Sequence, residues 1–218
     1  MDNLTIEQFP NGIKLYQGTD GYKFTKDAID LAKFCNIKHT DNVLEMCAGS
    51  GVVSFYTYSL GCFSKLYLNE IQHRNCEIIA KNIQLNNMEG VAKCLEGNLK
   101  TLKNSDFDKK LDVIICNPPY FKVQGSRIND NLSVAISRHE LEVTLEEIVS
   151  KAKELIKDKG RFYLCMMPSR MAEVVATLAK YKFECKTIKF LTNAKGEVNL
   201  CLFEAVNNAK SGVNITIE

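Results

Sequence analysis

Short apolar runs that alternate with helical segments are the feature that most restricts how this chain can fold. Four runs typical of buried strands occur between residues 42 and 116: NVLEMC, KLYLNE, VAKCLE and LDVIIC. Helical periodicity at 51–60 and 72–86 separates the first three of them. Strands joined by helical crossovers run parallel in one sheet and carry helices on both faces. The sequence therefore predicts an α/β domain with a Rossmann-like sheet.

Further elements extend this pattern at both ends. Short alternating runs on either side of Pro10-Asn11-Gly12 predict a β-hairpin within residues 1–20. We expect more helices at 25–36, from Thr144 to Gly160 with a Thr144/Glu147 capping box, and from Pro168 to about 180. A fifth strand at 161–167 and an antiparallel closing pair at about 182–192 and 197–206 complete a mostly parallel seven-stranded sheet. We therefore expect a hairpin extension at 1–24 and a single domain at 25–218.

Composition excludes several classes of function. The 218 residues are 45% hydrophobic and 25% charged, which is ordinary for a globular protein, and a net charge of +2 neither indicates nor excludes nucleic acid. The nine cysteines include no CxxC pair, and none of the three histidines is near a cysteine pair. We therefore expect no metal, and free thiols in the reducing cytoplasm. The polar N-terminus and the lack of apolar runs near about 20 residues predict neither a signal peptide nor a membrane span.

A glycine-containing loop follows the first predicted strand. In the segment Glu45-Met46-Cys47-Ala48-Gly49-Ser50-Gly51, the two glycines allow a tight turn and close approach to a ligand. Glu70 ends the second strand, where a carboxylate can accept both hydroxyls of a ribose. The plainer interpretation is a tight strand-to-helix turn with an exposed carboxylate. Ser54 replaces the third glycine of GxGxxG, and a sulfonium nucleoside, which has no phosphate, needs that turn less strictly than a dinucleotide does.

This pattern, E-x-x-x-G-x-G, resembles motif I of class I methyltransferases and implies S-adenosylmethionine as cofactor. Cys47 departs from it, since a glycine often stands there. The resemblance extends cofactor contact to Ala48 in the loop and to Ile71 beside Glu70. Thr25 and Asp27 resemble motif X, although a simple helix cap explains them equally well. Asn98 and Leu99 follow the third strand, where an aspartate usually accepts the adenine amine.

The tetrapeptide Asn117-Pro118-Pro119-Tyr120 ends the fourth strand and is the most specific motif in the sequence. A conjugated exocyclic amine is a poor nucleophile because its lone pair is delocalised. Two acceptors aimed at its N–H bonds, the Asn117 side-chain oxygen and the Pro118 carbonyl, favour a pyramidal nitrogen whose lone pair points at a methyl group. The prolines restrict the backbone, and Tyr120 can stack on a flat substrate. The plainer interpretation is a proline-rich turn that ends a strand.

Taken together, the chain resembles the bacterial tRNA1(Val) adenine-37 N6-methyltransferase family over almost all of its length. The matching segments are the N-terminal hairpin, FTKDAIDLAKF, VLEMCAGSG, LNEIQ, NPPY, SRHE at 137–140 and KGEVNLCLFEA. The resemblance implies methyl transfer to N6 of the adenine next to the anticodon, with tRNA as partner. It also implies a class I methyltransferase fold, for which a closing antiparallel hairpin is typical.

Three alternatives stay open. A glutamine methyltransferase of a release factor uses the same NPPY, but generally has a longer helical N-terminal domain. A guanine-N2 rRNA methyltransferase is another option. A catalytically silent RNA-binding scaffold is the third, although the intact motifs argue against it. No protein partner is predicted.

Residues 121–140 form a long connection after NPPY that carries Lys122, Arg127, Arg138 and His139. Long connections in compact domains are usually functional, and this one follows the carboxyl end of a strand, where ligands bind. We therefore expect it to hold tRNA phosphates, against the alternative of a solvated surface loop. Further lysines extend the predicted tRNA surface: Lys23, Lys26, Lys186, Lys189 and Lys195.

Overall fold

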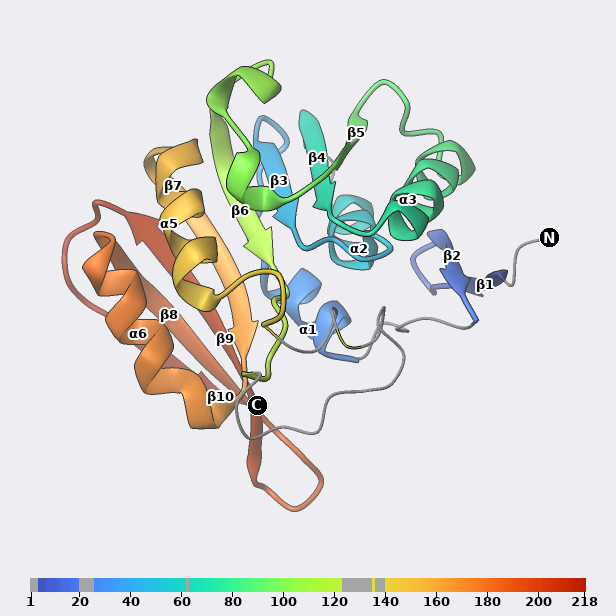
Figure 1. Ribbon diagram of the computed structural model, residues 1–218. Coiled ribbons are helices and arrows are strands. Elements are labelled where there is room, and N and C mark those ends of the chain that lie inside the picture. Colours follow the sequence, from blue (N-terminus) through green and yellow to red (C-terminus); the bar gives the residue numbers. More distant parts are fainter. Residues whose placement is uncertain (1–3, 20–25, 62, 123–134, 136–139) are drawn as a thin grey trace.

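Two β-sheets organise the part of the chain that the computed structural model describes, residues 4–19, 26–61, 63–122, 135 and 140–218. The larger sheet has eight strands in the order β10-β8-β9-β7-β6-β3-β4-β5, and β1 and β2 form a separate antiparallel pair (Figure 1). The strands are β1 (Leu4–Gln8), β2 (Lys14–Gly18), β3 (Asn42–Met46), β4 (Lys65–Glu70), β5 (Ala92–Glu96), β6 (Leu111–Cys116), β7 (Ile156–Met166), β8 (Phe183–Thr192), β9 (Val198–Asn207) and β10 (Asn214–Ile217). The helices are α1 (Lys26–Phe34), α2 (Val52–Leu60), α3 (His73–Leu85), α5 (Leu145–Leu155) and α6 (Met171–Lys180), with short 3-10 turns η1 (Leu99–Thr101), η2 (Asn104–Asp106) and η3 (Pro168–Arg170).

Helices cover both faces of the large sheet, as the apolar runs predict. Successive side chains of β6 alternate between the faces. Val113 and Ile115 pack with α1, α2 and α3, whereas Ile114 and Cys116 pack with α5 and α6. All four side chains are fully buried, which explains why the strand is a continuous apolar run rather than an alternating one.

The closing antiparallel pair is confirmed, but the sheet is larger than predicted. Strand β9 runs antiparallel to both of its neighbours, β7 and β8. On the other side of β7, the strands in the order β7-β6-β3-β4-β5 all run parallel to one another. The prediction of seven strands was wrong, because β10 adds an eighth, parallel to β8. All four residues of β10 are exposed, so the segment lacks the buried apolar run that reveals the other strands.

The helix predicted from Thr144 to Gly160 begins as expected and ends early. Thr144 accepts a hydrogen bond from the Glu147 amide, and the Glu147 carboxylate accepts one from the Thr144 amide, which confirms the capping box. The helix ends at Leu155, and strand β7 begins at Ile156 rather than at residue 161. Ile156 is buried and pairs with Leu111 of β6, so pairing within the sheet overrides the local helical pattern.

The N-terminal hairpin is attached to α3 through two asparagines one helical turn apart. The Asn82 side chain accepts from the Tyr16 amide at 2.6 Å and donates to the Tyr16 carbonyl at 3.2 Å. Asn86 pairs in the same way with the amide and carbonyl of Lys14. The boundary predicted between residues 24 and 25 lies outside the described residues and stays a prediction.

Candidate active site

Three adjacent strands bring the sequence motifs to one edge of the sheet. Strand β3 pairs in parallel with β4 on one side and with β6 on the other. The glycine loop after β3, Glu70 at the end of β4 and Asn117 after β6 therefore lie at neighbouring carboxyl ends. This is the edge at which open α/β sheets bind ligands.

Every second residue of the loop after β3, from Cys47 to Gly51, has a left-handed backbone. Cys47 has φ 56°, Gly49 has φ 57° and Gly51 has φ 81°. A Cβ atom on Gly51 would come within 2.7 Å of side-chain atoms of Leu68 and Phe55, whereas a Cβ on Gly49 would have nothing within 4 Å. Gly51 is thus required by packing, and Gly49 faces open space. Cys47, which replaces a glycine of the motif, keeps the left-handed backbone at a cost of roughly 1–2 kcal/mol.

Glu45 supports the loop from within the protein. Its side chain is 1% exposed and accepts a hydrogen bond from the Ser54 amide, in the first turn of α2, at 3.0 Å. Burial and, to a smaller extent, the charge of Glu70 raise the pKa of this carboxyl to about 7, although hydrogen bonding with Ser54 lowers it. Glu45 therefore helps to fix the path of the loop by joining the end of β3 to the first turn of α2.

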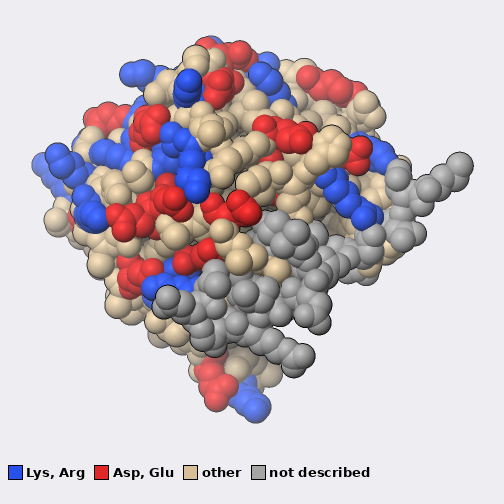
Figure 2. All heavy atoms as spheres, viewed as in Figure 1, with Lys and Arg blue, Asp and Glu red and all other residues tan. Residues whose placement is uncertain are grey.

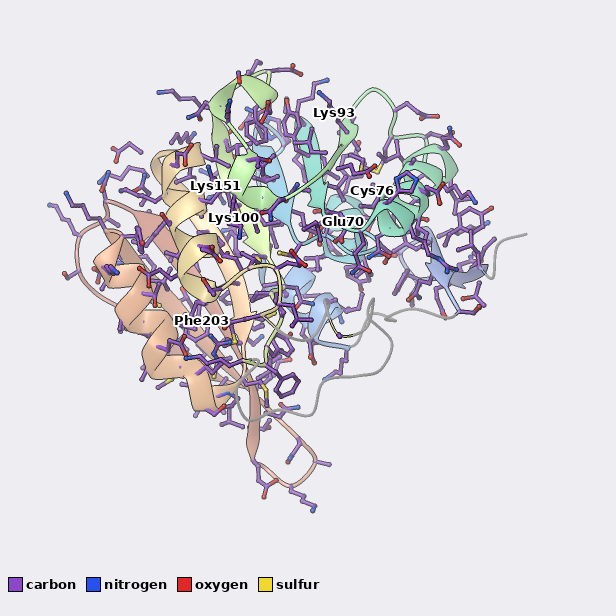
Figure 3. The ribbon with its side chains drawn as sticks, viewed as in Figure 1. Glu70, Cys76, Lys93, Lys100, Lys151 and Phe203 are labelled. Atoms are coloured by element: carbon purple, nitrogen blue, oxygen red, sulfur yellow. The ribbon has the colours of Figure 1, made fainter. Side chains whose placement is uncertain are left out.

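Glu70 ties the loop to the end of β4. Its carboxylate accepts from the Gly49 amide at 2.8 Å and from the Gln72 amide at 2.9 Å, and burial raises its pKa. Figure 3 labels Glu70 beside Cys76 of α3, whose thiol donates to the Glu70 carbonyl at 3.4 Å. The next residue, Ile71, is 36% exposed, which leaves an apolar surface beside the carboxylate.

In the segment after β5, both residues predicted to contact the cofactor already have partners within the protein. The Asn98 side-chain oxygen accepts from the Lys100 amide at 3.0 Å and caps η1. Leu99 is 4% exposed and belongs to the apolar core, so its side chain packs inward. The buried Asn69 of β4, which the sequence analysis missed, donates to the carbonyls of Leu95 and Gly97 and so holds this segment in place.

Asn117 is the centre of a small hydrogen-bonded cluster. Its side-chain oxygen accepts from the Tyr120 hydroxyl at 2.7 Å and from the Cys165 thiol at 3.1 Å. The same hydroxyl lies 3.3 Å from the Cys165 sulfur and 3.5 Å from a carboxylate oxygen of Asp27. Asp27 is in the first turn of α1, so the structure brings the motif X segment to the NPPY motif.

The rigidity expected of the two prolines has support in their burial. Pro118 and Pro119 are both buried, while Asn117 and Tyr120 are intermediate. The Tyr120 ring packs partly against the core on both faces of the sheet. The hydroxyl of Tyr120 thus has a hydrogen-bonding role that stacking alone does not require.

Cys165 is a site residue that sequence reasoning interpreted only as a buried free thiol. It is 0% exposed in β7, and burial raises its pKa to about 12, so it is a neutral donor. Its contact with Asn117 joins residues 48 apart in the chain. The only signal in the sequence was that Cys165 lies near the carboxyl end of a predicted strand, as Asn117 does.

The lysines predicted to meet tRNA are spread over several elements, and most have a partner. Lys122 pairs with Glu173 at 3.0 Å and Lys26 with Asp30 at 3.5 Å. Three others lie on or next to the last strands: Lys189 pairs with Glu218, Lys186 donates to the carbonyl of Lys210, and Lys195 is exposed in the turn between β8 and β9.

The remaining predicted site residues, Lys23, Thr25, Arg127, Arg138 and His139, lie outside the described residues. On the face shown in Figure 2, basic and acidic side chains are interspersed. Within the described ranges, no cluster of three or more His, Cys, Asp or Glu could hold a metal ion. None of the helices in that part of the chain is long and apolar enough to cross a membrane.

Comparison with known proteins supports the resemblance seen in the sequence. The sequence model of a family described as "Conserved hypothetical protein 95" matches residues 17–165. A tRNA1(Val) (adenine(37)-N6)-methyltransferase of a Flavobacteriaceae bacterium (strain 3519-10) is 25% identical over 67% of this chain and 60% of its own length. A release factor glutamine methyltransferase of Mycoplasma mycoides is 26% identical over 66% of this chain and 55% of its own length. The chain thus spans less than two thirds of each of these relatives.

Solved structures share the fold. The crystal structure of Methanocaldococcus jannaschii Trm5 in complex with adenosine superposes with a TM-score of 0.68 at 18% identity, covering 96% of this chain and 57% of that one. The α/β fold that the alternating strands and helices predict, and that the resemblance to methyltransferases implies, is therefore confirmed.

Proposed function

The chain belongs to the family described as conserved hypothetical protein 95, and we propose that it transfers a methyl group from S-adenosylmethionine to N6 of an adenine in tRNA, at position 37 next to the anticodon. The observation that carries the proposal is the position of Asn117-Pro118-Pro119-Tyr120 at the end of β6, beside the glycine loop of β3. The name of the Flavobacteriaceae relative supports the choice of adenine and of tRNA.

The residues at the ends of β3 and β4 suit a sulfonium nucleoside. Gly49 leaves open space where a side chain would otherwise stand, and Ile71 offers an apolar surface to a flat base. Glu70 would accept hydrogen bonds from the ribose hydroxyls. Its two carboxylate oxygens already accept from the amides of Gly49 and Gln72, so the hydroxyls have to share these oxygens with the amides or displace them. When bound, S-adenosylmethionine supplies an electrophilic methyl group on a positively charged sulfur.

The chain's own contribution to the reaction is to hold the amine. The Asn117 side-chain oxygen and the Pro118 carbonyl each accept a hydrogen bond from one N–H group of the amine. The nitrogen lone pair is then directed at the methyl group. The Asn117 oxygen already accepts from Tyr120 and Cys165, so the incoming amine has to replace one of these donors. The thiol is the weaker donor and the easier one to replace. Preorganised acceptors also stabilise the positive charge that develops on the nitrogen.

A release factor glutamine methyltransferase is the second candidate, because the Mycoplasma mycoides relative carries that name. A side-chain amide presents the same two N–H bonds to Asn117 and Pro118. The two candidates differ in the macromolecule that delivers the nitrogen, so they are separated by substrate rather than by the NPPY site.

The test is to incubate the protein with labelled S-adenosylmethionine and either unmodified bulk tRNA or a bacterial release factor. We expect label in the tRNA, with N6-methyladenosine found by nucleoside mass spectrometry. Asn117→Ala should abolish turnover while calorimetry shows S-adenosylmethionine binding within about twofold of wild type. Label in the release factor alone would favour the second candidate, and near-normal kcat in the Asn117→Ala variant would overturn the mechanism.

A further inference from the structure

Arg170 is a buried cation close to the NPPY motif that neither the sequence motifs nor the reaction outlined above accounts for. It is 9% exposed and ends η3, the turn that joins β7 to α6. Its guanidinium makes four hydrogen bonds. Nη1 donates to the Tyr120 carbonyl at 3.1 Å, Nη2 donates to Glu140 at 2.7 Å and to Glu173 at 2.9 Å, and Nε donates to Glu173 at 3.1 Å.

Glu140, the last residue of the SRHE segment, is the buried partner of this cation. Its side chain is 8% exposed, and the oxygen that accepts from Arg170 also accepts from the Leu145 amide at 3.1 Å. The Glu140 amide donates to the Phe121 carbonyl at 2.8 Å. Arg170 and Glu140 thus connect the backbone of Tyr120 and Phe121 to Leu145, the first residue of α5. All residues of this clasp are described residues.

Tyr120 links this clasp to the Asn117 side-chain oxygen, the atom proposed to accept a hydrogen bond from the amine. Arg170 holds the backbone carbonyl of Tyr120, and the hydroxyl of the same tyrosine donates to the Asn117 side-chain oxygen at 2.7 Å. Tyr120 is therefore held at its backbone by one contact and at its hydroxyl by the other. A change in the backbone position of Tyr120 would move the hydroxyl that orients Asn117.

Charge and geometry both require an arginine at this position. Burial lowers the pKa of Arg170, but the hydrogen bonds and charges of Glu173 and Glu140 outweigh it and raise the pKa. A buried ion pair contributes little net stability, because the cost of desolvating two charges offsets their attraction, so stability alone does not explain this pair. A guanidinium can donate in several fixed directions at once, whereas an ammonium acts as a point charge. Reacting groups have to be held within about 0.5 Å of the productive geometry.

We propose that Arg170, paired with Glu140, is a positioning residue that acts on Asn117 through Tyr120. The inference rests on the proposed function, because the group that it positions is the proposed amine acceptor. It assigns a role to the glutamate of SRHE, which the motif comparison left without one.

The test compares Arg170→Lys with Arg161→Lys as a matched control. Arg161 also donates to a backbone carbonyl, that of Asn36, and to a buried carboxylate, that of Asp41, but it pairs with Val113 away from the carboxyl ends of the strands. For Arg170→Lys we expect kcat to fall about three- to tenfold, the scale of one lost hydrogen bond to Asn117, with KM for tRNA and S-adenosylmethionine affinity within twofold of wild type. Arg161→Lys should keep kcat within twofold, whatever its effect on the unfolding temperature.

A second readout does not depend on activity. In protein labelled with 3-fluorotyrosine, the fluorine resonance of Tyr120, identified among the eight tyrosines by Tyr120→Phe, should shift in Arg170→Lys and not in Arg161→Lys. Glu140→Gln, which keeps the size of the side chain, should shift the same resonance if Arg170→Lys does not fold.

The outcomes separate the two proposals. A Tyr120 resonance that is the same in wild type and in the folded Arg170 or Glu140 variant would overturn the clasp, as would kcat values for the two lysine variants that agree within twofold. A wild-type protein that methylates neither tRNA nor release factor would overturn the proposed function. In that case the fluorine shift alone decides whether Arg170 positions Tyr120.

Discussion

Gly51 and Gly49 are two residues apart in the same loop, share a left-handed backbone and differ in what a side chain would contact. For Gly51→Ala the new Cβ would lie 2.7 Å from atoms of Leu68 and Phe55, both fully buried. The left-handed backbone costs about 1–2 kcal/mol for alanine, and overpacking in a core adds about 1–3 kcal/mol. We expect Gly51→Ala to destabilise the protein by about 2–5 kcal/mol, the sum of these two costs.

Gly49→Ala should carry the backbone cost alone, about 1–2 kcal/mol, because its Cβ would have no atom within 4 Å. Its main effect should instead be on the cofactor, since the new Cβ would occupy open space at a residue whose amide donates to Glu70, the proposed ribose ligand. Urea unfolding and calorimetry with S-adenosylmethionine measure the two effects separately. If Gly49→Ala lowered stability as much as Gly51→Ala and left cofactor affinity unchanged, the assignment of Gly51 to packing and Gly49 to the cofactor would be refuted.

Three further predictions concern the residues around this loop. Tyr120→Phe should lower kcat about three- to tenfold in single-turnover assays, the scale of one lost hydrogen bond to Asn117, and Tyr120→Ala should lower it more; a Phe variant equal to wild type would leave stacking as the only role of the ring. Glu70→Gln should weaken S-adenosylmethionine binding by about 1.5–3 kcal/mol in calorimetry, and unchanged affinity would show that the carboxylate serves only its donors within the protein, such as the amides of Gly49 and Gln72. Glu45 has a folded-state pKa of about 7 against an ordinary value of 4.5, so its contribution to stability is full below pH 4.5 and is lost as pH rises through 7. In the wild type this should lower the free energy of unfolding by up to about 3 kcal/mol between pH 5 and pH 8, and Glu45→Gln should not show that decrease. A free energy of unfolding that depends on pH equally in the variant and in the wild type would contradict this.

Local patterns predicted the motifs and most of the elements, because those features depend on residues close together in the chain. The glycine loop, the strand-end glutamate and NPPY are each contained within a few residues. The predictions that failed depended on pairing in the sheet. The helix after Thr144 ends at Leu155 because Ile156 pairs with Leu111, and β10 forms by pairing with β8.

The parts of the candidate site that the sequence could not reveal are long-range contacts. Cys165 meets Asn117 across 48 residues, and Arg170 meets the Tyr120 carbonyl across 50. Neither residue type is unusual in its local context, since a cysteine in an apolar strand and an arginine before a helix are both ordinary. Only the register of β7 against β6 brings them to the end of the strand that carries the motif.

The two departures from the broad motif pattern have physical explanations that leave the proposed chemistry intact. Asn98 replaces an aspartate, but its side-chain oxygen caps η1, a task that asparagine and aspartate perform equally well. Cys47 replaces a glycine and still adopts the left-handed backbone that the loop requires, with its side chain partly buried against the core. Each substitution therefore preserves the path of the backbone, which is what the loops after β3 and β5 contribute. Asn117 is different, because its side-chain oxygen itself would contact the amine, so its proposed role depends on the side chain and not only on the path of the backbone.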